Sequence, residues 1–122
     1  MTRSEMLTYI DMKAGAVRAR YITIAPGQEA TYIMKGQQAR EYAAVSFGGA
    51  PPPLVAAEAA ATGTTAQDAA LSITAMEVQW STLASHIEGV RRASKIAVEA
   101  APSEDAAKQA FENCIATFSA FL

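Results

Sequence analysis

The residues closest in type and spacing to a hydrolytic site are His86, Ser81 and Ser85. Such a site needs a histidine base, a carboxylate that orients it and a loop that binds an oxyanion. The sequence suggests neither a carboxylate nor such a loop, and Glu88 would lie about 200° around a helix from His86. As the only histidine, His86 cannot make a zinc site without other suitable ligands. We therefore expect a structural or solvent-exposed histidine and assign no catalytic or metal-binding residue.

The remaining chemistry-bearing residues also lack a catalytic pattern. Cys114 is a single cysteine on an apolar helical stripe, so we expect a buried structural thiol rather than a reactive thiol or an intermolecular bridge. Gly48-Gly49 precedes prolines instead of a helix with a lysine, which argues against a phosphate-binding loop. Carboxylates are scattered along the chain. The sequence thus favours a non-enzymatic protein without a cofactor.

The composition narrows the class of protein further. The chain has 122 residues, with 10 Lys and Arg against 12 Asp and Glu, and both signs are interspersed. This balance does not fit the basic footprint of a nucleic-acid-binding protein. No run approaches the roughly 18 apolar residues needed to cross a bilayer. Residues 1–10 have no apolar core of a secretory signal, so we expect synthesis in a cytoplasm and no membrane association.

One cluster of basic residues stands out against this even background. Arg91, Arg92 and Lys95 lie close together in sequence, and Glu88 and Glu99 each lie about one helical turn from the cluster. Oppositely charged residues at that spacing are typical of a solvated helix face. We expect such a face, with a charged docking patch as the alternative.

The elements that would position these residues are dominated by one apolar ladder with alternating spacings of three and four. The ladder comprises Ile73, Met76, Trp80, Leu83, Ile87 and Val90, and fades into Ser94 and Ala97. A mean spacing of about 3.5 residues keeps one stripe of a helix against one partner, as in coiled coils and helical bundles. We expect a helix seam, in the core of one chain or between subunits. The helix should start near Thr64 or Thr65 and run about 35 residues to Ala101-Pro102.

The N-terminal part predicts two further helices. A helix from about Arg3 to Ile24 would carry its stripe on Met6, Ile10, Lys13, Val17, Tyr21 and Ile24. Pro26-Gly27 should end it. A second helix from Gln28 to about Val45 would share one face among Tyr32, Gly36, Ala39 and Ala43. The short connection predicts an antiparallel hairpin, with the small residues of the second helix against the first.

A segment rich in Gly and Pro precedes the C-terminal part of the chain. Residues 46–53 contain Gly48-Gly49 and three consecutive prolines, which favours an extended spacer, with a proline-rich recognition peptide as the alternative. A short helix should follow from Leu54 to Ala61 and stop at Thr62-Gly63. Ser103 should cap a last helix. Its stripe comprises Phe111, Cys114, Ile115, Phe118, Phe121 and Leu122, placed either in the core or in an interface.

Together these patterns predict an all-α fold. It consists of an N-terminal antiparallel helical hairpin, a Pro-rich connector and a long-helix, coiled-coil-like bundle. We expect a single helical domain over residues 1–122, with a hairpin at 1–46, a connector at 47–53 and a C-terminal helical bundle at 54–122.

Two stretches of the chain resemble a known family. Residues 10–21, with the sequence IDMKAGAVRARY, precede Pro26-Gly27-Gln28, Tyr32 and Ala39-Arg40. Together with residues 80–98, this region is similar to small Ala-rich helical proteins associated with the tail fibres of bacteriophages and prophages. The resemblance implies a non-enzymatic structural adaptor that binds tail-fibre or baseplate subunits, made in the host cytoplasm and located in the virion tail. It leaves open a transient fibre-assembly chaperone, or a phage-encoded regulatory binder of a host protein.

A partner-binding face follows from the same interpretation. Arginine and tyrosine are favoured at protein interfaces. The candidates in the regions of resemblance are Arg18, Arg20, Tyr21, Tyr32 and Arg40. We also expect a homo-oligomer, for which a trimer would match the symmetry of a fibre, although the mixed residues of the ladder select no strand number.

Overall fold

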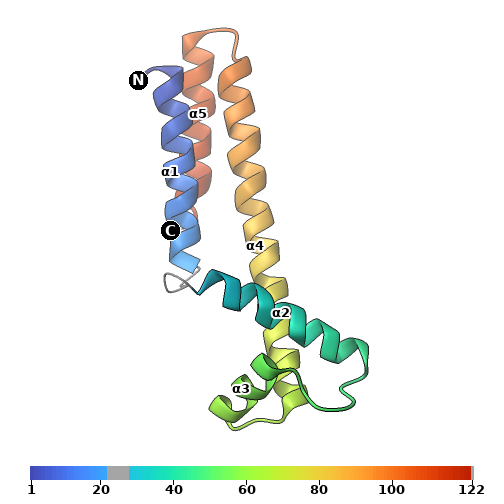
Figure 1. Ribbon diagram of the computed structural model, residues 1–122. Coiled ribbons are helices and arrows are strands. Elements are labelled where there is room, and N and C mark those ends of the chain that lie inside the picture. Colours follow the sequence, from blue (N-terminus) through green and yellow to red (C-terminus); the bar gives the residue numbers. More distant parts are fainter. Residues whose placement is uncertain (22–27, 122) are drawn as a thin grey trace. The chain divides into compact units, whose positions relative to one another are not determined.

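The computed structural model describes residues 1–21 and 28–121 (Figure 1). These residues form five helices and no strand: α1 (Arg3–Tyr21), α2 (Glu29–Ala44), α3 (Pro53–Thr62), α4 (Ala66–Ala100) and α5 (Glu104–Ser119). The predicted all-α class is therefore confirmed, as are the long helix and the short helix after the prolines. The expected extension of the first helix to Ile24, the break at Pro26-Gly27 and the apolar Leu122 lie outside the described residues.

The chain divides into two compact units. Unit 1 consists of Met1–Thr23 and Thr82–Leu122, and unit 2 consists of Ile24–Ser81. This division differs from the predicted one, which separated 1–46 from 54–122 at the connector. The reason is physical: α1 contacts residues that are 70 to 101 positions away in sequence, and local sequence patterns do not report such a pairing.

Unit 1 contains α1, the C-terminal part of α4, and α5, which lie side by side (Figure 1). All three helices contribute to one core. Its buried residues are Met6, Ile10, Ala14, Val17, Ile87, Val98, Ala107, Cys114 and Phe118. The partly buried Leu83, Val90 and Phe111 pack against it. Tyr9 of α1 also meets Phe111 edge-to-face, with ring centroids 5.5 Å apart. The Phe118 stripe of the last helix is thus a core stripe in this unit.

The stripes of unit 1 differ from the prediction at single positions. Ala14 is fully buried where Lys13 was expected, and Lys13 is half-buried beside it. Tyr21 is 47% exposed. Near the end of α4, Val98 is buried and Ala97 is exposed. These shifts follow the helical period, because Ile10, Ala14 and Val17 keep the four-three spacing of one face.

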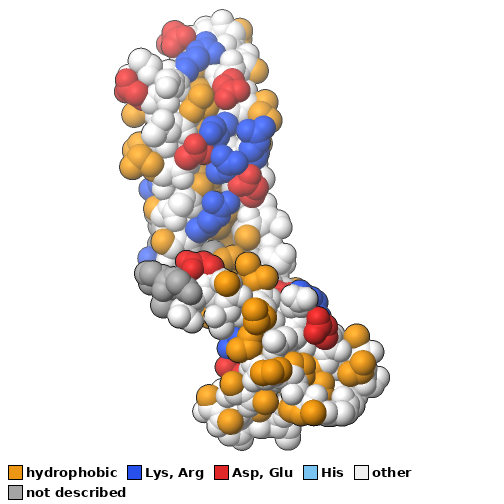
Figure 2. Space-filling view, in the orientation of Figure 1, with side chains coloured by type: hydrophobic (Ala, Val, Ile, Leu, Met, Phe, Trp, Pro, Cys, Tyr) orange, Lys and Arg blue, Asp and Glu red, His pale blue; other side chains and the backbone are white. Residues whose placement is uncertain are grey.

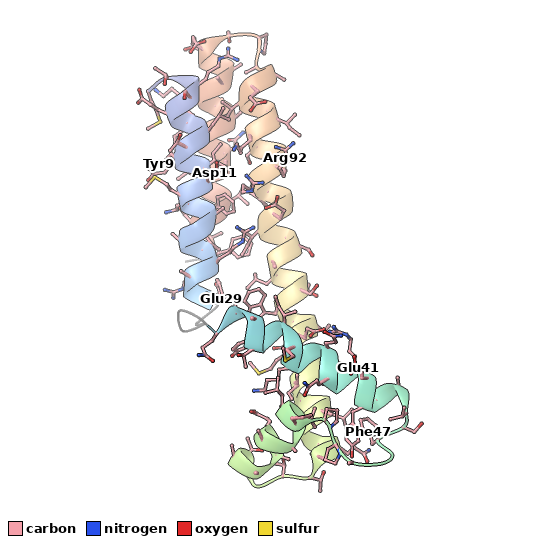
Figure 3. The ribbon with its side chains drawn as sticks, in the orientation of Figure 1. Tyr9, Asp11, Glu29, Glu41, Phe47 and Arg92 are labelled. Carbon is pink, nitrogen blue, oxygen red and sulfur yellow. The ribbon has the colours of Figure 1, made fainter. Side chains whose placement is uncertain are left out.

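Unit 2 has a smaller core, between α2, α3 and the first part of α4. Its buried residues are Ala39, Tyr42, Val55, Ala59, Ala69 and Ala70, and Phe47, Ala66 and Ile73 pack against them. Phe47 comes from the connector and meets Tyr42 edge-to-face at 5.4 Å (Figure 3 labels Phe47). The connector is therefore not only a spacer, since it supplies an aromatic side chain to the core.

The predicted pairing of α2 with the first helix is not confirmed. Gly36 and Ala39 are buried, as a close helix contact requires, but Ala39 packs with α3 and α4 inside unit 2. The backbone of Gly36 lies against the carboxylate of Glu77. Tyr32 and Ala43, which were expected on the same face, are exposed. The small residues of α2 thus pack within their own unit.

The helix ends follow their capping residues. The Ser103 hydroxyl accepts a hydrogen bond from the Ala106 amide at 3.1 Å, and the Thr65 hydroxyl accepts one from the Asp68 amide at 3.1 Å. Gly63 ends α3 in the left-handed conformation, with φ 69°. The Arg3 guanidinium donates to carbonyls at the end of α4, at 2.8 Å for Ala101. Sequence patterns identify the first three caps, whereas Arg3 acts over a long sequence separation.

Candidate functional site

The five predicted partner-binding residues fall on two helices in different units. Arg18, Arg20 and Tyr21 lie in the last turn of α1, and Tyr32 and Arg40 lie two turns apart on α2. Tyr21 is 47% exposed and Tyr32 is 46% exposed. Each group is considered within its own unit.

Three of these five residues have partners in their own unit. Arg18 forms an ion pair with Glu88 of α4 at 3.0 Å. Arg40 forms an ion pair with Glu77 of α4. The Tyr21 hydroxyl donates a hydrogen bond to the carbonyl of Phe121.

The other two predicted residues are less engaged. Arg20 is exposed and forms no ion pair within residues 1–21 and 28–121. The Lys35 ammonium lies 6.0 Å from the centre of the Tyr32 ring, at the limit of a cation–π contact. Of the five candidates, Arg20 and Tyr32 therefore have the weakest contacts within the described residues, and they stay predicted partner-binding residues.

Two residues of the basic cluster on α4, Arg91 and Lys95, form ion pairs with α1, whereas Arg92 is exposed. Asp11 lies between two cations, with Arg91 and Lys95 each at 2.8 Å. Arg91 also binds Glu88 at 2.8 Å, and Glu88 in turn binds Arg18. The side chains of Arg91 and Lys95 are only 23% and 18% exposed. Figure 2 shows positive and negative side chains gathered on one face of unit 1, and Figure 3 labels Asp11.

The carboxylates of this network are held in their charged forms. Hydrogen bonds from Lys95 and then Arg91 lower the pKa of Asp11. Hydrogen bonds from Arg91 and then Arg18 lower the pKa of Glu88 to about 2, although partial desolvation acts in the opposite direction. The same contacts, with Glu88 first, raise the pKa of Arg91. The lowered pKa values keep both carboxylates charged at neutral pH, so their ion pairs join α1 to α4.

Two open cavities are lined by both polar and apolar side chains. One of about 320 Å³ is lined by Met1, Ser4, Glu5, Thr8, Tyr9 and Met12. Another of about 240 Å³ lies between α4 and α5, where burial raises the pKa of the Cys114 thiol. His86 is exposed, with its ring 5.2 Å from that of Phe121. Among the described residues, no group of three His, Cys, Asp or Glu is placed to hold a metal ion.

The apolar ladder of α4 serves two cores instead of one seam. Ile73 packs against the core of unit 2, whereas Leu83, Ile87 and Val90 belong to unit 1. Within the same ladder Trp80 is half-buried. Met76 is 59% exposed, which corrects the expectation of a core position for it in a single chain. On α5, Ile115 is half-buried beside the fully buried Phe118.

Unit 2 displays large apolar side chains that its core does not use. The exposed residues of this kind are Tyr32, Ile33, Met34, Val45, Leu71, Met76 and Val78. Ile33 is 71% exposed. Figure 2 shows hydrophobic side chains gathered over α2. A prediction of one apolar stripe per helix does not include this surface. The sequence signal for it is the run Tyr32-Ile33-Met34, because three consecutive residues of a helix cannot all face one core.

Comparisons with known proteins identify no relative of this chain. No protein-family model, curated protein or solved structure matches this chain. Within residues 1–21 and 28–121, no helix combines the length and apolar character needed to span a membrane. The candidate contact surfaces are therefore the exposed apolar side chains of unit 2, together with Arg20 and Tyr32.

Proposed function

We propose that this chain is a non-enzymatic bacteriophage tail-associated protein that binds tail-fibre or baseplate subunits as a structural adaptor. The observation that carries the proposal is the exposed apolar surface of unit 2, in particular Ile33 and Met34 on α2. Large exposed apolar side chains that gather on one surface are typical of protein interaction sites. The resemblance of residues 10–21 and 80–98 to tail-fibre-associated proteins supports the choice of partner.

The two units have different parts in this proposal. The core of unit 1 contains side chains from three helices. Ion pairs of Asp11 and Glu88 also join α1 to α4 in this unit. Unit 2 has a core in which most of the buried residues are alanines, and it displays large apolar side chains on its surface. Unit 2 is therefore the part that contacts the tail, and unit 1 is the stable part of the adaptor.

The roles of the candidate residues follow from their contacts. Tyr32 is a contact residue on the surface of unit 2, and Arg20 is one at the end of α1. Arg18 and Arg40 instead hold their helices to α4, because their guanidinium groups are engaged by Glu88 and Glu77. We also propose that the chain forms a homo-oligomer, and a trimer would match the symmetry of a fibre. Equilibrium sedimentation measures the oligomeric state directly.

The proposal is tested by recovering the tagged chain from infected or prophage-induced cells. Mass spectrometry then identifies the proteins that accompany it, and purified particles are searched for the chain. Fibre or baseplate subunits in the eluate, with the chain at fixed stoichiometry in particles, are the expected result. Fibre binding without incorporation would indicate an assembly chaperone instead. Recovery of host proteins alone would contradict the tail assignment and favour a regulatory binder.

A further inference from the structure

We infer that the outward face of α2 binds a basic amphipathic helix of the partner protein. The inference deepens the proposed function and rests on it, since it names the chemistry of the segment that the adaptor recognises. The face is defined by Ala30, Ile33, Met34, Gln37 and Glu41. All five are exposed, while Gly36, Ala39 and Tyr42 are buried. At about 100° per residue, these two sets lie on opposite sides of the helix.

The centre of the outward face is apolar. Ile33 is 71% exposed and Met34 is 51% exposed. Neither residue belongs to the core of unit 2, which lies on the opposite side of α2. A methionine side chain is flexible and polarisable, so it adapts to the shape of an apolar partner. These two side chains offer a partner an apolar contact at no cost to the packing of unit 2.

Acidic residues lie near both ends of this face. Glu41 is on the face, two turns after Ile33, whereas Glu29 lies one turn before Ile33 at the edge of the face; Figure 3 labels both residues. Glu29 and Glu41 are twelve positions apart, which is about 18 Å along the helix. Neither forms an ion pair with any residue of 1–21 and 28–121. Glu41 accepts a hydrogen bond from Gln37 at 3.2 Å.

The charges of unit 2 leave these carboxylates uncompensated. The unit contains five acidic residues and two basic ones. Both basic side chains are engaged: Lys35 binds Glu58 at 2.7 Å, and Arg40 binds Glu77. An occupant of the outward face therefore meets an apolar centre, with the Glu41 carboxylate at one end of the face and the Glu29 carboxylate at its edge near the other end. The complementary segment is a helix whose central apolar residues are flanked by Lys or Arg.

The same charges disfavour other occupants. A second copy of this face would place carboxylates against carboxylates, whether the two helices run parallel or antiparallel. Nucleic acids and anionic membranes would also meet charges of their own sign. The structure thus distinguishes a basic partner helix from self-association through this face.

The test measures peptide binding to the full chain by calorimetry. The probe is a synthetic helix of about 18 residues with leucines in the centre and lysines toward both ends. One comparison peptide has glutamate in place of lysine, and another has the same composition in shuffled order. The basic peptide should bind at least about tenfold more tightly than either, and the difference should shrink at high salt.

Two variants and their matched controls locate the binding surface. Ile33→Ser and Met34→Ser should each weaken binding of the basic peptide by about tenfold. Ile96→Ser on α4 and Met12→Ser on α1 remove the same side-chain types at 52% and 66% exposed positions of unit 1, and should leave binding unchanged. Glu29→Gln should reduce the preference for the basic peptide, whereas Glu5→Gln should not. Circular dichroism at 222 nm verifies that each variant is folded.

Several results would overturn the inference. Equal binding of the basic and acidic peptides, equal binding of the shuffled peptide, or no binding of the basic peptide would each do so. A dimer that dissociates on Ile33→Ser would assign the face to a second copy instead. Capture of tail subunits that is insensitive to Ile33→Ser would retain the proposed function and refute this face. Basic-peptide binding at the face without capture of any tail subunit would retain the inference and refute the tail assignment.

Discussion

At the residue scale, the glycines inside helices show which positions the fold itself requires. A Cβ built on Gly15 or Gly89 would meet no atom within 4 Å, whereas one on Gly36 would meet the Glu77 carboxylate. Glycine in a helix costs roughly 0.5–1 kcal/mol relative to alanine. A side chain at Gly36 would therefore have to displace the Glu77 carboxylate, whereas Gly15 and Gly89 have room for one.

This difference predicts the sign of three substitutions. Gly15→Ala and Gly89→Ala should each raise the free energy of unfolding by about 0.5–1 kcal/mol. Gly36→Ala should raise the free energy of unfolding by less, because the new methyl group displaces the flexible Glu77 carboxylate from Arg40. Urea denaturation measures all three. Destabilisation by Gly15→Ala or Gly89→Ala would mean that a close contact exists at that glycine.

The sequence predicts single buried residues well where a local period decides their side. Ile87, Cys114 and Phe118 lie on apolar stripes and are all buried. It fails for Asp11, whose partners Arg91 and Lys95 are about 80 residues away. The basic cluster was expected to be solvated, because Glu88 and Glu99 lie about one helical turn from it. Only the pairing of α1 with α4 reveals that a carboxylate from another helix joins them.

At the element scale, the ion pairs between α1 and α4 predict a dependence of stability on pH. The pKa values of Asp11 and Glu88 lie below their ordinary values of 3.8 and 4.5, and that of Glu88 falls to about 2. Folding therefore lowers both pKa values, and the charged forms stabilise the native state. This contribution is fully present above the ordinary values and is lost as the pH falls toward about 2.

The corresponding experiment follows the melting temperature between pH 7 and pH 2. Glu88→Gln should lower the melting temperature at pH 7 and should reduce its fall below pH 4.5, because the titrating group has been removed. Glu112→Gln is the matched control. Its ion pair with Lys108 is long, at 4.0 Å, and lies within α5. If Glu88→Gln and the wild type had parallel pH profiles, the network would not link folding to pH.

The elements themselves were largely predictable, but their partners were not. Pro51–Pro53, Gly63 and Ser103 mark the helix ends by local chemistry, and the structure places ends there. The exposed Ile33 of α2 was not predicted as a contact residue, because residue type alone favours Arg and Tyr at interfaces. A helix with apolar residues on two sides has no single period, so its second side is easily assigned to the core.

At the scale of the whole molecule, the two cores predict separate responses to mutation. Val55 is fully buried in unit 2, and Ile10 is fully buried in unit 1. Removing buried methyl groups leaves a cavity, at a cost of about 2–5 kcal/mol for Ile→Ala and less for the smaller valine. Each substitution should loosen the unit that contains it, because the lost contacts lie within one core.

Hydrogen–deuterium exchange measures this response. Val55→Ala should accelerate exchange in α2 and α3, while α5 keeps its wild-type rate. Ile10→Ala should accelerate exchange in α1 and α5 and leave α3 unchanged. Uniform acceleration of all helices by either substitution would mean that the two units unfold as one cooperative body.

The central claim is that the outward apolar face of unit 2 binds a phage tail subunit. The most direct test compares the capture of fibre and baseplate subunits from infected cells by two tagged double variants. Ile33→Ser with Met34→Ser changes unit 2, and Met12→Ser with Ile96→Ser makes the same changes in unit 1. The account predicts that the first variant loses the tail subunits while the second retains them. Equal capture by both, or no tail subunit captured by the wild-type chain, would contradict it.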